Sequence, residues 1–94
     1  MSKTTKKIRI LLADDHAVVR QGFRLILSGQ ADMEIIGEAG DGRQAVEQAE
    51  KLHPDVVVMD VAMPNLNGID ATRRLAEAAP HTRVLALSMD KDAV

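Results

Sequence analysis

The chain has 94 residues, of which 46% are hydrophobic and 28% are charged, with a net charge of −2 at pH 7 and no cysteine. This length and composition indicate one globular domain and exclude a disordered chain. The missing cysteine excludes disulfides, thiolate metal sites and cysteine nucleophiles, and the near-neutral charge with a single aromatic residue argues against nucleic-acid binding.

The start of the chain, residues 1–7, is rich in Ser, Thr and Lys, and we expect a flexible tail there. It lacks the apolar core of a secretory signal, and no apolar run approaches the roughly 18 residues of a membrane span. The sequence therefore predicts a cytoplasmic protein without a membrane partner.

The first two predicted elements are a strand and a helix. Residues 8–13 form a nearly continuous apolar run, which is typical of a strand buried on both faces of a parallel sheet. Residues 17–29 then change to helical spacing, with Val19, Phe23 and Ile26 on one face.

A second strand–helix unit follows. Residues 33–39 are predicted to be a strand, and residues 42–52 a helix with an apolar stripe. Asp41 is a suitable N-cap for that helix, and Pro54 ends it.

The remaining elements repeat the alternation. We expect a strand over residues 56–59, which Asp60 ends, and a helix over residues 68–79. A fourth strand is expected over residues 83–88. Alternating strands and helices indicate an α/β fold, in which right-handed crossovers place helices on both faces of a doubly wound parallel sheet.

Polar residues follow three of the predicted strands. Asp14 and Asp15 follow the first, Asp60 ends the third, and Ser88 ends the fourth. Parallel strands end at one edge of their sheet, and ligands of open α/β sheets bind outside that edge. If the first and third strands are neighbours, the three aspartates converge.

Clustered carboxylates repel each other unless a cation lies among them. Mg²⁺ prefers oxygen ligands and is often held by one or two carboxylates together with a phosphate. The pattern therefore suggests a Mg²⁺ site that receives a phosphoryl group, with one aspartate as the nucleophile that forms an aspartyl-phosphate.

Each of these residues also has an ordinary structural interpretation. An Asp pair before a helix is often an N-cap, Asp60 could form a turn, and Ser88 could be a simple strand-end hydroxyl. His16 and His53 lack the spacing of metal ligands, and we expect both to be structural. The hypothesis depends on the combination of residues.

Four segments together resemble a known family: "LLADDHAVVRQGFRLIL", "GEAGDGRQAVE", "PDVVVMDVAMPNLNGIDATRRL" and "VLALSM". They are similar to the receiver domain of bacterial two-component response regulators, closest to the NarL/FixJ subfamily. The resemblance implies a flavodoxin-like fold with strand order 2-1-3-4-5.

The resemblance also implies the roles of individual residues. Asp60 matches the phosphoacceptor and Ser88 the switch hydroxyl. Asp14, Asp15, Asp60 and the backbone carbonyl of Ala62 match the Mg²⁺ ligands. The phosphoryl donor would be a sensor histidine kinase or a small phosphodonor, and the output would be transcription through a DNA-binding domain. The module itself would be no enzyme beyond its own phosphorylation and dephosphorylation.

The resemblance covers about residues 8–90. We therefore expect residues 8–94 to form an incomplete receiver domain, in which the fourth helix, fifth strand and fifth helix are missing. The Lys that the family carries after its fifth strand is missing with them, and Lys91 lies at a different place in the pattern. We expect a sheet of order 2-1-3-4 with an open edge at the fourth strand, which favours strand-mediated or domain-swapped homo-oligomers.

Two other functions are compatible with parts of this pattern. Phosphatases with an Asp nucleophile carry a second aspartate two residues later, where this chain has Ala62. The chain could also be an interaction fragment of a receiver that cannot complete the switch. DNA binding by this chain alone is not expected.

Overall fold

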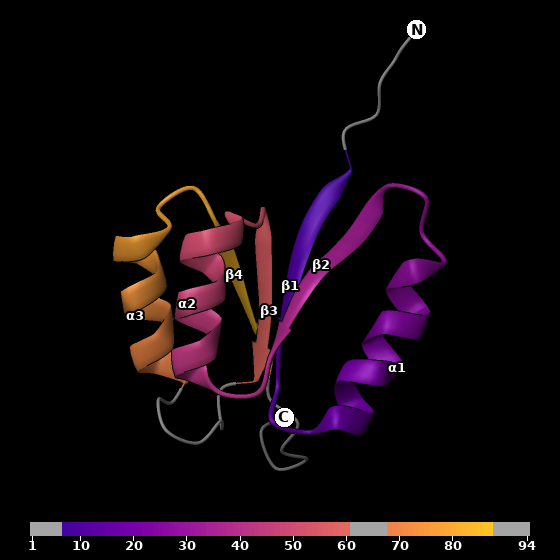
Figure 1. Cartoon of the computed structure of the whole chain (residues 1–94), viewed down its shortest axis with the longest axis horizontal. Coiled ribbons are helices and arrows are strands. Elements are labelled where there is room, and N and C mark those ends of the chain that lie inside the picture. The colour runs from indigo at the N-terminus through magenta and orange to yellow at the C-terminus, as the bar shows by residue number, and fades with distance from the viewer. Residues whose placement is uncertain (1–6, 61–67, 88–94) are drawn as a thin grey trace, which may run out of the picture.

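The computed structural model describes residues 7–60 and 68–87. Within them the chain alternates strands and helices (Figure 1). The elements are β1 (Ile8–Ala13), α1 (Ala17–Ser28), β2 (Met33–Ala39), α2 (Gly42–Leu52), β3 (Val56–Asp60), α3 (Gly68–Ala78) and β4 (Arg83–Leu87). The predicted alternation is confirmed, and β3 continues one residue beyond the prediction to include Asp60. The predicted tail, residues 1–7, lies outside the described residues except for Lys7.

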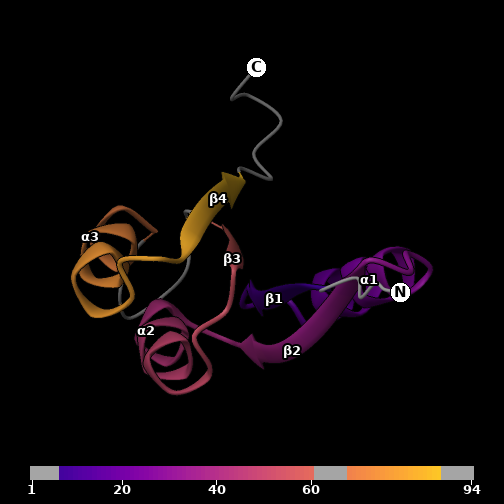
Figure 2. The same cartoon turned by 90° about the horizontal axis from the view of Figure 1, so that it is seen from above.

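The four strands form one parallel sheet in the order β2-β1-β3-β4. This is the order predicted for a flavodoxin-like receiver fold. Figure 2 shows α2 and α3 together on one face of the twisted sheet and α1 on the other. The arrangement confirms a doubly wound sheet.

The main core lies between the sheet and the pair of helices α2 and α3. Alternate residues of β1 and β3 point into it, because successive side chains of a strand face opposite sides of the sheet. Its buried members include Leu11, Val57, Met59, Ala45, Ala49, Ala71 and Leu75. Small Ala side chains let both helices approach the strands closely.

Among the described elements, α1 alone covers the opposite face, and this helix has no fully buried residue. Val19 and Phe23 are half-buried, as predicted, but Ile26 is 66% exposed. The expected apolar face of Val19, Phe23 and Ile26 is therefore wrong at its last member. Leu27 is half-buried in its place, because the helix turns its i, i+4, i+8 row toward the sheet.

Side-chain hydrogen bonds hold both ends of helix α2. The Asp41 carboxylate accepts a hydrogen bond from the Gln44 N–H at 2.8 Å, which confirms the predicted N-cap. At the other end, the Arg9 guanidinium donates to the carbonyls of Leu52 and His53, each at 2.8 Å. These contacts connect α2 to β1.

Among the strands that the structure describes, β4 forms one edge of the sheet, beside β3. Leu85 of this strand is 53% exposed, whereas Val84 packs against the core. None of the helices in the described part of the chain is long and apolar enough to cross a membrane.

Candidate functional site

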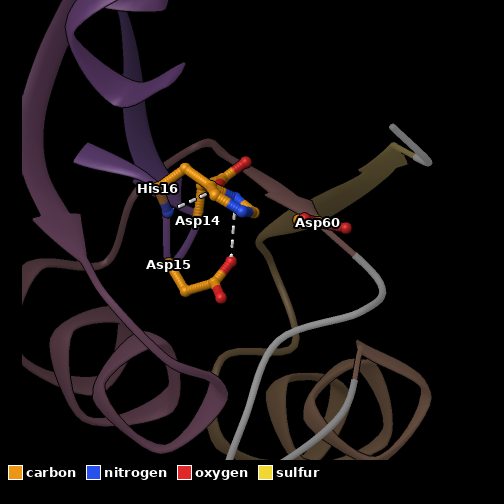
Figure 3. A group of neighbouring side chains, drawn as sticks. All are labelled: Asp14, Asp15, His16 and Asp60. Atoms are coloured by element: carbon orange, nitrogen blue, oxygen red, sulfur yellow. Dashed lines mark hydrogen bonds and ion pairs between the residues drawn. The ribbon is translucent and has the colours of Figure 1, made fainter. Parts of the chain in front are cut away.

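The ends of β1 and β3 bring the predicted acidic residues together. Ala13, the last residue of β1, pairs with Met59, so the next residues, Asp14 and Asp60, lie side by side. Figure 3 shows them with Asp15 and His16. Each of these four side chains offers a ligand atom, and the four atoms lie within 4.8 Å of one another. The predicted convergence of the three aspartates is confirmed.

Two of the three carboxylates are buried. Asp14 is 7% exposed and Asp60 is 5% exposed, whereas Asp15 lies at the surface. A buried carboxylate is costly unless it is hydrogen-bonded or paired with a cation. The site therefore concentrates negative charge where solvent screens it poorly.

The main chain of Asp14 is held on both sides. Its N–H donates to the carbonyl of Ala39 in β2 at 3.0 Å, and its own carbonyl accepts a hydrogen bond from the Arg20 guanidinium. Its carboxylate accepts the backbone N–H of His16 at 2.8 Å. The N-cap of α1 is His16, without a side-chain cap bond. Neither aspartate of the pair therefore occupies the N-cap position that the alternative interpretation required.

His16 belongs to the cluster, which the sequence analysis missed. Its Nδ1 atom lies 2.9 Å from Oδ1 of Asp14 and 3.1 Å from Oδ1 of Asp15 (Figure 3). The hydrogen bond to Asp14, followed by the charge of Asp15, raises the pKa of His16 above its ordinary value of 6.5. The sequence could have indicated this role of His16, because His16 directly follows the acidic pair at the carboxyl edge of the sheet.

A second group that the sequence analysis missed joins α1 to β2. Arg20 donates from Nε to Oε1 of Glu38 at 2.9 Å, and Arg24 donates from Nε to Oε2 at 2.8 Å. The hydrogen bond from Arg24 is the main cause that lowers the pKa of Glu38, and Arg20 adds to it. Arg20 also lines a small pocket together with Asp14, Asp60 and Phe23. In the sequence, the only sign that Arg20 contacts the site is its position early in the helix that follows the acidic pair.

The donor set suits a small divalent cation. Carboxylate oxygens are the ligands that Mg²⁺ prefers, and two of the three carboxylates in this cluster are buried. The cluster is therefore compatible with Mg²⁺. The predicted carbonyl ligand of Ala62 and the Ser88 hydroxyl lie outside the described residues, as does Lys91.

The chain matches the family model of the response regulator receiver domain over residues 10–94. Among similar proteins, the transcriptional regulatory protein YxjL of Bacillus subtilis is 45% identical over 82 residues, which cover 87% of this chain and 38% of that protein. The chain spans less than half the length of such longer relatives.

Solved structures agree with this match. The response regulator domain of Thermotoga maritima CheB superposes with a TM-score of 0.85 at 46% identity, over 88% of this chain and 61% of that one. The signal receiver domain of NarL from Mycobacterium tuberculosis gives a TM-score of 0.87 at 32% identity, over 94% of this chain and 71% of that one. Both sequence and fold therefore point to one family.

Proposed function

Because the chain belongs to the receiver domains of response regulators, we propose that it relays a two-component signal by accepting a phosphoryl group on Asp60. The observation that carries the proposal is the position of Asp60, which is buried at the end of β3 and within 4.8 Å of the ligand atoms of Asp14 and Asp15. A nucleophilic carboxylate needs close positive charge to receive a phosphoryl group, and this cluster can collect a divalent cation.

We assign Asp14, Asp15, Asp60 and the carbonyl of Ala62 as the residues that would hold Mg²⁺. The bound ion would neutralise charge on the phosphoryl oxygens and on the carboxylates. One oxygen of Asp60 forms a bond to phosphorus as the bond between phosphorus and the donor's leaving group breaks. Burial of Asp60 limits the access of competing water to that oxygen.

The partners in this proposal are a sensor histidine kinase or a small phosphodonor, and the Ser88 hydroxyl carries the switch by bonding a phosphoryl oxygen. The named relatives YxjL and DegU are transcriptional regulatory proteins, which supports control of transcription as the output of the longer protein. The cytoplasmic location stays a prediction of the sequence.

The module acts on itself only, by accepting and then losing its phosphoryl group. Position 62 is Ala, so the residue two places after Asp60 offers no carboxylate for acid–base catalysis on other phosphate esters. A phosphatase reaction is therefore not proposed.

Phosphorylation of three proteins tests the proposal: the wild-type chain, Asp60→Asn and Asp55→Asn. Asp55 is a matched control, because it lies just before the same strand, where it accepts the Arg9 N–H at 2.8 Å. With Mg²⁺ and acetyl phosphate, intact mass should show one added phosphoryl group on the wild type and on Asp55→Asn, and none on Asp60→Asn. Equal labelling of the two variants would rule the proposal out.

The alternative is a receiver fragment that binds partners but does not switch. In that case phosphorylation would change neither the oligomeric state nor hydrogen exchange near Ser88. A change in either quantity on phosphorylation favours the complete function.

We also propose that copies of this chain associate through β4. The strand lies at the edge of the sheet and exposes Leu85, and open apolar edges pair readily with other strands. Light scattering should show strand-mediated or domain-swapped oligomers, and Leu85→Lys should reduce them. A monomer at all concentrations would contradict this proposal.

A further inference from the structure

We propose that Arg20 is a positioning residue, which holds the peptide between Asp14 and Asp15 so that both carboxylates face the cation. The inference rests on the proposed function, since it concerns the same Mg²⁺ site. Arg20 itself is not offered as a ligand, because a guanidinium carries only donors.

The first step is the geometry of the bridge. The guanidinium of Arg20 donates in two directions, to the Asp14 carbonyl from Nη1 and to Oε1 of Glu38 from Nε. The Arg20 side chain is 21% exposed and that of Glu38 is 31% exposed, so the bridge is shielded from much of the solvent. Arg20 thereby links the loop after β1 to the side chain of a β2 residue.

The second step is what the bridge restrains. The Asp14 carbonyl belongs to the peptide unit that joins Asp14 to Asp15. The two dihedral angles beside that unit, ψ of Asp14 and φ of Asp15, set the direction of the two side chains relative to each other, and a hydrogen bond to the carbonyl restrains both angles. The N–H of Asp14 is already bonded to Ala39 of β2 at 3.0 Å. The N–H of Asp14 therefore bonds β2 directly, and its carbonyl is connected to β2 through Arg20 and Glu38.

The third step is the demand of the metal. Mg²⁺ requires near-ideal octahedral geometry, so small displacements of its carboxylates weaken binding. Residues that orient metal ligands without touching the metal typically contribute about 10- to 100-fold to metal affinity. The clamp on the peptide between two ligands is such a contact.

The charge of Arg20 has the opposite effect, which makes the inference testable. Arg20 lines the same pocket as Asp14 and Asp60, so its positive charge repels an incoming cation. If charge alone mattered, neutralising Arg20 would tighten Mg²⁺ binding. If positioning matters more, neutralising it weakens Mg²⁺ binding.

Arg24 provides a matched control. It lies on the same helix and donates to the other oxygen of the same Glu38, whereas Arg20 donates to Glu38 and also to the Asp14 carbonyl. Arg24→Gln therefore removes a comparable ion pair and the same unit of charge, but leaves the clamp on the Asp14 carbonyl in place.

The main experiment is calorimetric titration of the 94-residue chain with MgCl₂. Arg20→Gln should bind Mg²⁺ about tenfold more weakly than the wild type, and Arg24→Gln should match the wild type. Glu38→Gln, which replaces the anionic anchor of the bridge by a neutral amide, should also weaken binding. Equal affinities of the two arginine variants, or tighter binding by Arg20→Gln, would overturn the inference.

Amide hydrogen exchange without metal gives a second readout. Exchange of the Asp14 N–H should be faster in Arg20→Gln and unchanged in Arg24→Gln. If Arg20→Gln does not fold, Arg20→Lys replaces it, because a single ammonium lacks the two-directional fork of a guanidinium. Wild-type affinity and wild-type exchange in Arg20→Lys would overturn the inference. If the wild type itself binds no Mg²⁺, the proposed function fails, and the exchange comparison still decides whether Arg20 positions Asp14.

Discussion

The Nδ1 atom of His16 lies 2.9 Å from Oδ1 of Asp14, so the imidazole is hydrogen-bonded to a buried carboxylate of the site. The same nitrogen lies 3.1 Å from Asp15. His16 therefore brings positive charge to the acidic pair whenever it is protonated, and this contact has consequences for the pH dependence of stability.

Stability without metal should fall as pH rises through the titration of His16. The folded protein raises the pKa of His16 above 6.5, chiefly through the hydrogen bond to Asp14. The stabilisation is therefore complete below about pH 6.5 and is lost as pH rises through the folded pKa. Thermal unfolding between about pH 5 and pH 8.5 should show this loss. His16→Gln should have a flatter profile over the same range, and parallel profiles would contradict the prediction.

Acid should remove a second contribution, that of Glu38. Arg24 and Arg20 lower the pKa of this carboxylate below 4.5, so its stabilisation is present above pH 4.5 and is lost as pH falls through the folded pKa. Glu38→Gln should cost about 1 kcal/mol or less at pH 7, since the ion pairs are partly exposed, and the difference should shrink in acid. Urea unfolding at several pH values measures this difference in the free energy of unfolding. Glu34→Gln, an exposed site on the same strand, should show a smaller effect.

Addition of Mg²⁺ should stabilise the chain. A ligand that binds only the folded state at ten times its Kd adds about 1.4 kcal/mol to the free energy of unfolding. Asp15→Asn removes a proposed ligand at the surface and should lose most of this gain. Asp32→Asn removes the same charge away from the site and should keep it. A shift of the melting temperature by Mg²⁺ that is equal in all three proteins would argue against a site at these carboxylates.

Close packing at Gly37 should make that position intolerant of a side chain. A Cβ there would lie 2.9 Å from Cδ1 of Leu52 and 3.2 Å from Cδ1 of Leu11. Gly37→Ala should therefore cost about 1–3 kcal/mol in urea unfolding. The control is Gly22→Ala in α1, where nothing lies within 4 Å of the new Cβ, and where Ala should add up to about 1 kcal/mol. A neutral Gly37→Ala would show that Leu52 moves away without cost.

Much of the fold could be predicted from the sequence, because local patterns specify it. Continuous apolar runs marked strands such as Ile8–Ala13, and helical spacing marked α2 together with its Asp41 cap. Chain alternation placed Asp14 and Asp60 at the same edge of the sheet, and the family resemblance supplied the strand order. The positions of strand ends follow from the topology, so the acidic cluster could be predicted from the sequence.

Contacts between elements were decided only by the tertiary structure. Pairing of Ile10 with Ile35 and of Leu11 with Gly37 leaves Ile36 as an extra residue, an irregularity that no local pattern marks. The exposure of Ile26 depends on how α1 lies over the sheet.

The bonds of Arg20 also depend on the contact between two elements. Periodicity shows which face of a helix is apolar, but it contains no information about the residue of another strand that a long polar side chain will reach. The sequence alone therefore determined which carboxylates meet. The packing of α1 against β2 decided that Arg20 reaches both Asp14 and Glu38, because that contact requires two separate elements at a definite distance and angle.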